Sequence, residues 1–451
     1  MTAPHPSALP PLPEDEVVDL CSGLLKIDSS NYGDGSGPGE REAGEHVMAL
    51  LSDVGLNPTY LETGERRANV VLRTPGVDPS RPALCIHGHL DVVPADADDW
   101  QVPPFGAVQR DGCLWGRGAV DMKDMDAMML AVIRHLARTG QRPPRDIVWA
   151  FFADEEAGSE DGSYQVVRRR PELFERVTEA ISEVGGFSVT LPTRAADGTQ
   201  APPRRAYLVQ TAEKAIAWIH LKATGVAGHG SLPSTENAVV RLAEAITRID
   251  AHRWPRRYIP AVRGLLEGLS DITGIPFEND DCDPLLAQLP SIRGFIAGSI
   301  ANTSTPTMLS AGYKHNVVPQ TATAALDCRA LPGELEQLLA TLRELAGPHV
   351  QVIETFTAPS LEAPFETPLV DRMRAALLAE DPSATVLPYC LSGGTDNKAL
   401  AELGISGYGF APLQLPAELP FAAMFHGIDE RVPLEGLRFG ARVLHRLVLD
   451  C

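Results

Sequence analysis

Residues 83–91 have the sequence ALCIHGHLD, in which an apolar run leads directly into a histidine-rich segment. Continuous apolar runs are typical of strands that are buried on both faces, so residues 83–86 predict a strand inside a parallel sheet. Alternation along such a strand places His87, His89 and Asp91 on one face. An HxHxD run on its own is more often a structural cluster than a functional site, so its meaning depends on the rest of the chain.

The same mixture of strands and helices continues after this segment. Residues 147–152, IVWAFF, form a second continuous apolar run. Between the two runs, the apolar residues from Met125 to Leu136 fall on one helical stripe, and Gly140 is a typical helix stop. Strands that alternate with helices predict a mostly parallel sheet covered by helices on both sides. The pattern returns from about residue 360 to the C-terminus.

Residues 213–358 have a different pattern. Their expected order of elements is strand, helix, strand, strand, helix, strand, which is that of a ferredoxin-like α+β domain. Its first helix is expected to begin at Ser234 or Thr235, which can cap an N-terminus. An insertion of mixed helix and loop, about 251–300, interrupts the order after this helix. We therefore predict an α/β domain formed by residues 1–212 and 359–451, with the α+β domain inserted into it.

Acidic residues occupy two positions close to the predicted strand ends. Asp121 lies in GRGAVDMK (116–123), between a glycine turn and a helix, and the acids of 154–156 follow the second apolar run. Each has an ordinary alternative, because carboxylates favour helix N-termini and adjacent acids are usually a solvated loop. Ligands, however, bind outside the carboxyl ends of parallel strands, where these acids and His89 can converge. Imidazole and carboxylate ligands suit zinc, with cobalt or manganese as related alternatives.

Composition and missing motifs exclude several classes of function. The chain has 451 residues and a formal net charge of −20, which leaves no cationic surplus for binding a nucleic-acid backbone. It has no apolar run of membrane-spanning length, and Met1–Pro13 is expected to be a loose leader rather than a signal peptide. Its seven cysteines are scattered without a CxxC, which fits a reducing cytoplasm and argues against a thiolate zinc site. The GxSxG and HExxH motifs are absent as well.

Taken together, the motifs resemble the signature of the di-zinc family that contains aminoacylase, glutamate carboxypeptidase and succinyl-diaminopimelate desuccinylase. The resemblance spans nearly the whole chain, in the right order. It implies a mostly parallel-sheet zinc-exopeptidase catalytic domain with an inserted ferredoxin-like lid that forms the dimer contact. The segments that carry it are HLDVVP (89–94), GRGAVDMK (116–123), DEE (154–156), GHGSLP (228–233), NVVP (316–319), Arg329 before Pro332-Gly333, GGTD (393–396) and HG (426–427).

The resemblance implies a centre with two divalent metal ions, most often zinc. Asp121 would bridge the two ions. One ion would also be bound by His89 and Glu183, and the other by Glu156 and His426. The family varies between Asp and Glu at the position of Glu183.

Two further residues take roles in the chemistry by the same resemblance. Asp91 would accept the second N–H of His89 and so fix its ring. Glu155 would be the general base that takes a proton from the attacking water and later gives it to the leaving amine. Glu179, one helical turn from Glu183, is an alternative acid at the metal centre.

The resemblance also implies a substrate site. His229, contributed by the lid of a partner subunit, would stabilise the oxyanion. Arg329, Asn316 and the backbone N–H groups near Gly394 and Thr395 would hold a substrate carboxylate, for which the guanidinium fork is well suited. The alternatives are a surface-loop histidine at 229 and a salt bridge between Arg329 and an acid of the lid.

The expected function is metal-dependent hydrolysis of an amide bond in a small N-acyl amino acid or a short peptide. A dipeptidase or desuccinylase of the same family is an alternative, although the insertion at 251–300 is longer than in compact desuccinylases. Another alternative is a non-catalytic binding protein that kept the fold and lost its metals. A degenerate relative of that kind is expected to lack at least one of Asp121, Glu155, Glu156 and His426, and all four are present.

Overall fold

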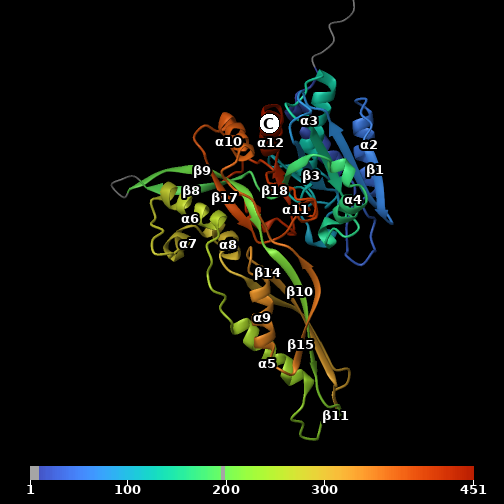
Figure 1. Cartoon of the computed structure of the whole chain (residues 1–451), viewed down its shortest axis with the longest axis vertical. Coiled ribbons are helices and arrows are strands. Elements are labelled where there is room, and N and C mark those ends of the chain that lie inside the picture. The colour runs from blue at the N-terminus through green and yellow to red at the C-terminus, as the bar shows by residue number, and fades with distance from the viewer. Residues whose placement is uncertain (1–9, 195–198) are drawn as a thin grey trace, which may run out of the picture.

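The chain forms an upper body around a large sheet and a lid around a smaller sheet, and the lid extends below the body (Figure 1). The computed structural model describes residues 10–194 and 199–451, so most of the expected leader at Met1–Pro13 lies outside the described residues. Within the described part of the chain, no helix has both the length and the apolar character needed to cross a membrane.

The large sheet has parallel strands at its centre and antiparallel strands on both flanks. β3 pairs in parallel with β6 and β7, and β7 pairs in parallel with β18, as predicted for the core of this sheet. β17 also runs parallel to β9, whereas β8 is antiparallel to it. Along the sheet the order is β1 (Thr59–Gly64), β2 (Arg67–Thr74), β6 (Ile147–Phe152), β3 (Ala83–His89), β7 (Val177–Ser182), β18 (Ser406–Gly409), β9 (Gln200–Glu213) and β16 (Leu361–Glu362), with β17 (Thr385–Leu391) and β8 (Phe187–Arg194) on β9.

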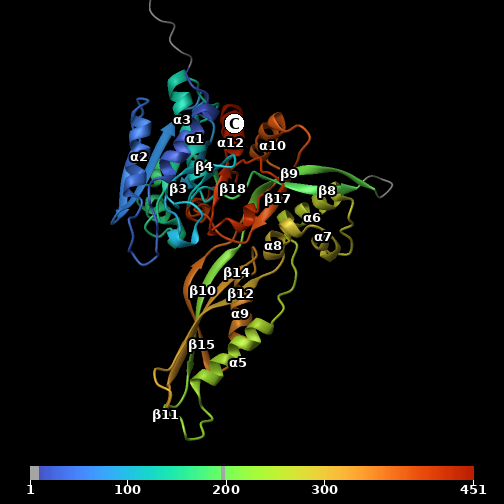
Figure 2. The same cartoon turned by 180° about the vertical axis from the view of Figure 1, so that it is seen from behind.

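Both faces of this sheet are covered, which explains the continuous apolar runs. Leu84 and Trp149 pack on one side of the sheet, and Cys85 and Val148 pack on the other. The first side is covered by α1 (Pro13–Leu25), α2 (Arg41–Ser52), α3 (Lys123–Thr139), α10 (Pro368–Glu380) and α12 (Leu434–Asp450), of which α1, α3 and α12 lie together in Figure 2. The second side is covered by α4 (Ser163–Arg169) and α11 (Asn397–Ala401). A small sheet of β4 (Val108–Arg110), β5 (Cys113–Trp115) and β19 (Arg431–Pro433) completes the body.

The lid is a ferredoxin-like α+β unit, as predicted. Its strands β10 (Ala215–Thr224), β12 (Thr303–Ala311), β14 (Thr321–Ala330) and β15 (Val350–Ala358) form an antiparallel sheet in the order β12-β14-β10-β15. Helices α5 (Ala238–Ala251) and α9 (Leu335–Ala346) pack on one face of it. The expected caps of α5 were wrong, because the side chain of Asn237 accepts the N–H of Val239 at 2.9 Å. A two-stranded ribbon of β11 (Gly228–His229) and β13 (Val317–Val318) forms its far end (Figure 1).

The insertion at 251–300 packs on the body rather than on the lid helices. It contains α6 (Pro260–Thr273), α7 (Asp283–Gln288) and α8 (Pro290–Ser299). Helix α6 lies against β8 and β17 of the large sheet. The fit is close, since a Cβ atom at Gly264 would come within 2.9 Å of Pro388 and one at Gly268 within 2.3 Å of Leu387. The insertion therefore adds a wall next to the end of the sheet that carries the predicted chemistry.

Candidate metal centre and substrate cleft

All five expected metal ligands come together at the carboxyl ends of the central strands. Asp121 lies between the two histidines: its Oδ1 is 3.1 Å from Nε2 of His89, and its Oδ2 is 3.3 Å from Nε2 of His426. His89 also approaches Glu183 at 3.6 Å, and His426 approaches Glu156 at 3.0 Å. The arrangement has two halves, each with one histidine and one glutamate, that share one aspartate.

The backbone around these ligands is held in conformations that most residues avoid. Asp154, Val184 and His426 have φ values of 66°, 52° and 56° in the left-handed region. Such residues cost about 1–3 kcal/mol each and are typical of functional sites, where the surrounding structure imposes them. The left-handed turn at Asp154 starts the short 3₁₀ turn that carries Glu155 and Glu156. His426 projects from a loop and has a side chain that is 58% exposed.

Asp91 has a wider role than the expected one. Its Oδ1 lies 3.5 Å from Nδ1 of His89, which is also 3.0 Å from the backbone oxygen of Asp91. The same carboxylate accepts the backbone N–H groups of Glu155 and Glu156, each at 3.1 Å, and an N–H of Asn31 at 2.9 Å. Asp91 therefore orients one ligand ring and also fixes the turn that carries two acids of the site.

The Glu155 carboxylate faces the same cluster without a hydrogen bond to any described residue. Burial, and after it the neighbouring Glu183 carboxylate, hold the pKa of Glu155 well above its usual value. Burial also raises the pKa of Glu183 to about 8. Hydrogen bonds to Asp121 and Glu156 raise the pKa of His426 to about 10. These raised pKa values indicate that the carboxylates of the site lie close together and that nearby cationic side chains do not neutralise all of them.

Divalent cations fit this set of side chains. A ligand atom from each of His89, Asp121 and Glu156 lies within 4.8 Å of the others, and the same holds for His89, Glu155 and Glu183. The Oε1 atom of Glu156 is buried and has no protein partner. Imidazole nitrogen and carboxylate oxygen are the donors that zinc and related ions bind. A cation would satisfy that oxygen and offset the repulsion between the carboxylates.

A cleft of about 370 Å³ opens over this cluster, between the body and the uncovered face of the lid sheet. From the lid, Ile216, Trp218 and Phe356 contribute to its wall. The rings of Trp218 and Phe356 lie 4.8 Å apart, on neighbouring strands β10 and β15. From the body, the wall includes Gly394 and Ala422. A small molecule in this cleft would lie between the metal cluster and an apolar lid surface.

The sequence model of peptidase family M20/M25/M40 matches residues 85–450, which include every side chain of the cluster. The chain belongs to this family. Its members with known structure share the fold described above: the M20 family metallo-carboxypeptidase Sso-CP2 from Sulfolobus solfataricus superposes with a TM-score of 0.70 at 17% identity, covering 97% of this chain and 99% of that one.

Curated relatives of this M20 chain include enzymes named for N-acyl amino acids. The N-fatty-acyl-amino acid synthase/hydrolase PM20D1 of Xenopus tropicalis is 24% identical over 436 residues, which cover 94% of this chain and 83% of that protein. Human aminoacylase-1 is 27% identical over 410 residues, covering 87% of each. Both similarities extend well beyond the metal motifs.

The residues of this M20 chain that were expected to bind a substrate carboxylate have different surroundings in the structure. Arg329 lines the cleft, but its guanidinium forms two hydrogen bonds with Asp327 on the same strand, at 2.6 and 2.9 Å. Gly394 also lines the cleft, where a Cβ atom would come within 2.3 Å of Lys398. The N–H of Thr395 donates to the buried Glu213 at 3.2 Å, and a role for backbone N–H groups near Gly394 and Thr395 in holding a substrate carboxylate stays a prediction.

His229 and Asn316 lie at the far end of the lid, away from the metal cluster of the same chain (Figure 1). They are neighbours there, since the N–H of Gly230 donates to the backbone oxygen of Asn316 at 2.9 Å. His229 is exposed, and its Nδ1 lies 2.8 Å from Oγ of Ser231. A role for either residue in the site therefore requires a second subunit and stays a prediction.

Sequence reasoning missed three buried charged residues near the site. Glu213 and Lys398 pair at 3.2 Å beneath the Gly393–Thr395 turn. Glu430, four residues after His426, accepts hydrogen bonds from the loop that carries Asp121. No local spacing signals these partners, because they lie far apart in the sequence. By contrast, the two candidate glutamates have different surroundings: Glu179 pairs with Arg145 at 2.6 Å, and Glu183 lies 3.6 Å from His89 in the cluster.

Proposed function

We propose that this protein hydrolyses the amide bond of N-acyl amino acids, with Glu155 as general base and two divalent metal ions as cofactors. The observation that carries the proposal is the pairing of two histidines about Asp121, beside a free Glu155 carboxylate. Membership of the M20 family supports hydrolysis, and the relatives named for N-acyl amino acids support the substrate class. Short peptides with a free C-terminal carboxylate are the second substrate class, because they present the same amide and the same anion.

The ligand sets would be His89 with Glu183 and His426 with Glu156, with Asp121 shared. When bound, the two cations supply a Lewis acid for the amide carbonyl and lower the pKa of a water molecule. Glu155 accepts the proton of the attacking water and delivers it to the leaving nitrogen.

Other side chains of the chain position the substrate. Arg329 would hold the carboxylate of the amino-acid part, with its pair to Asp327 keeping the guanidinium in place. Trp218 and Phe356 shield the cleft from water on the lid side. Gly394 forms part of the cleft wall and packs so closely against Lys398 that a Cβ atom would not fit there.

Zinc as the ion, a cytoplasmic location and a homodimer formed through the lid belong to the same proposal. The nitrogen and oxygen donor set supports zinc, with cobalt or manganese as substitutes. The seven free cysteines support a reducing compartment. The dimer is supported by apolar side chains exposed on the lid, with Met308 and Leu309 70% and Tyr313 84% exposed. Such a dimer would bring His229 of one subunit to the cleft of the other.

The decisive experiment combines elemental analysis with a single substitution. We expect about two divalent ions per chain, and hydrolysis of N-acetyl amino acids that is lost on chelation and restored by zinc or cobalt. Glu155→Gln should keep its metal content and its unfolding temperature while turnover falls by about 10²–10⁴-fold. Glu160→Gln is the matched control, because Glu160 lies on the same surface loop but pairs with Arg168. Near-normal turnover in Glu155→Gln would exclude it as the base, and a folded, metal-free, inert protein would point to a binding function.

A further inference from the structure

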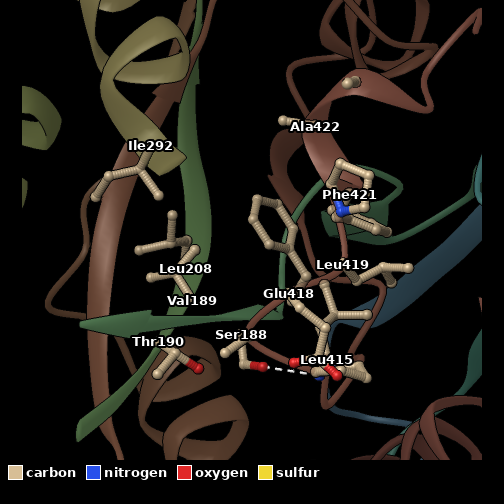
Figure 3. Close-up of a pocket in the computed structure, with 15 residues that line it drawn as sticks. Ser188, Val189, Thr190, Leu208, Ile292, Leu415, Glu418, Leu419, Phe421 and Ala422 are labelled. Carbon is tan, nitrogen blue, oxygen red and sulfur yellow. Dashed lines mark hydrogen bonds between the residues drawn. The ribbon is translucent and has the colours of Figure 1, made fainter. Parts of the chain in front are cut away.

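An apolar pocket lies beside the metal cleft, between the large sheet, helix α8 of the insertion and the segment 415–423 (Figure 3). Its volume is about 370 Å³, which is in the range of small-molecule sites, about 300–1,000 Å³. Leu208 and Ile292 form one wall, and Phe421 and Leu419 lie opposite them in Figure 3. Leu208, Ile292 and Phe421 are all buried in the core of the body.

The polar groups of this pocket leave an apolar interior. The hydroxyl of Ser188 accepts the backbone N–H of Leu415 at 2.9 Å, so this oxygen already has a donor. Among the described residues that line the pocket, Glu418 alone carries a charge, and it is exposed. A charged ligand group would lose its hydration there without gaining a hydrogen-bond or ionic partner. A hydrocarbon group does not carry this desolvation cost.

The pocket and the metal cleft are adjacent along two segments of chain. Ala422 lines both cavities, and His426 follows it by four residues. On the other side, Glu183 and Val184 line the cleft and Phe187 lines the pocket. A small cavity between them is lined by residues of both segments. A ligand group that extends from the metal cluster past Ala422 therefore reaches the apolar surface of the pocket.

We propose that this pocket binds the acyl chain of the substrate, and that the enzyme prefers N-acyl amino acids with a linear hydrocarbon chain over acetyl derivatives. The inference rests on the proposed function. Arg329 and Gly394 line the metal cleft but not the apolar pocket, so the carboxylate end of the substrate belongs to the cleft. With the scissile carbonyl at the metal cluster, the part that can pass Ala422 into the pocket is the acyl side.

The proposal gives the insertion a specific task. Helix α8 supplies Ile292, and without the insertion the pocket would lack this wall. Each methylene that enters the pocket should raise kcat/KM about fourfold, because burial of a methylene from water corresponds to about that ratio. The rise should stop when the pocket is full, since any further methylene would stay in water.

The test is a chain-length series on the zinc-loaded protein, with one amino acid and acetyl, hexanoyl and dodecanoyl groups. Ile292→Trp should fill the pocket and remove the gain with length while changing acetyl hydrolysis less than about twofold. Leu419→Glu should act in the same way by placing a carboxylate in the pocket, and because Leu419 is only half-buried it keeps the test independent of core packing. Ala297→Trp is the control, as Ala297 is exposed on the same helix and outside the pocket.

Direct binding of free dodecanoate, measured by calorimetry, separates the inference from the proposed function. Wild-type protein and Ala297→Trp should bind dodecanoate, and the other two variants should bind it at least about tenfold more weakly. Acetyl hydrolysis without any dependence on chain length, or a gain that survives both pocket variants, would overturn the inference and leave the proposed function standing. Dodecanoate binding without hydrolysis of any N-acyl amino acid would overturn the proposed function and support the apolar site. In a second series, with an acetyl group on amino acids of increasing side-chain length, a gain that both pocket variants remove would show that the acyl assignment is wrong.

Discussion

Glu430 offers a direct test of how the metal centre is held in shape. Its buried carboxylate accepts four hydrogen bonds from one loop: from Arg117 and the backbone N–H of Gly118, both at 2.9 Å, and from the N–H groups of Val120 at 2.7 Å and Asp121 at 3.1 Å. Since Asp121 is the aspartate shared by both halves of the metal cluster, a residue beside the C-terminal helix fixes the centre of the site. We therefore expect Glu430→Ala to affect both folding and metal binding.

The expected magnitude follows from the partners that would be left behind. Arg117 has a side chain only 4% exposed, so Glu430→Ala leaves a buried guanidinium without its anion. Breaking a buried ion pair in this way costs about 3–5 kcal/mol. Unpaired backbone N–H groups add up to about 1–3 kcal/mol each where water does not replace the carboxylate. A displacement of Asp121 by about 1 Å would also lower turnover by about 10²-fold.

The assay is urea unfolding followed by circular dichroism, once with saturating zinc and once with chelator, together with zinc titration of the folded protein. Glu430→Ala should be less stable in both conditions and should bind zinc more weakly. Glu435→Ala is the control, because Glu435 lies five residues away on α12 with a side chain 80% exposed, and it should behave as wild type. If Glu430→Ala loses less than about 1 kcal/mol and keeps its zinc affinity, then the four hydrogen bonds do not hold the loop.

Two further predictions concern the substrate site. Arg329→Ala should raise KM at least about tenfold for substrates with a free carboxylate and leave kcat nearly unchanged. The reason is that the lost interaction is made equally in the ground state and the transition state. Carboxylate-free amides are the control, and an equal effect on them would exclude the proposed role of Arg329. Mixing His229→Ala subunits with Glu155→Gln subunits should restore activity above that of either variant alone, because some heterodimers would then carry one complete site, and no restoration would exclude His229 of the partner subunit from the site.

The sequence predicted the parts of the fold that follow from local patterns. Residues 147–152 form β6 with every side chain buried, and the helix before them ends with Gly140 in the left-handed conformation, as predicted. The caps of α5 were not predicted correctly, since Ser234, Thr235 and Asn237 can all cap a helix and tertiary packing chooses between them. The packing of the insertion could not be predicted from the sequence either, because an apolar helix stripe does not indicate which sheet it will cover.

The candidate site also has parts that the sequence predicted and parts that it did not. The five metal ligands could be proposed because each belongs to a short motif at the end of an expected strand or in a loop. Their supporting partners could not, since Glu430 meets the Asp121 loop across about 310 residues. Thr395 is a further example, because its N–H donates to Glu213, which lies 182 residues earlier in the sequence. Contacts of this kind depend on tertiary structure alone.

The connection between β9 and β10 has a mechanical consequence. These strands belong to different sheets, and the single residue between them, Lys214, is buried and anchored by its N–H to the backbone oxygen of Leu391 at 3.1 Å. β10 has 10 residues, so at about 3.3 Å per residue it acts as a lever of about 33 Å that starts at this anchor. A rotation of about 10° at Lys214 would move the far end of the lid, near His229, by about 6 Å while displacing Ile216, beside the metal cluster, by about 1 Å. In the proposed dimer, such a rotation would let the tip of the lid meet or leave a second subunit while the body stays aligned for chemistry.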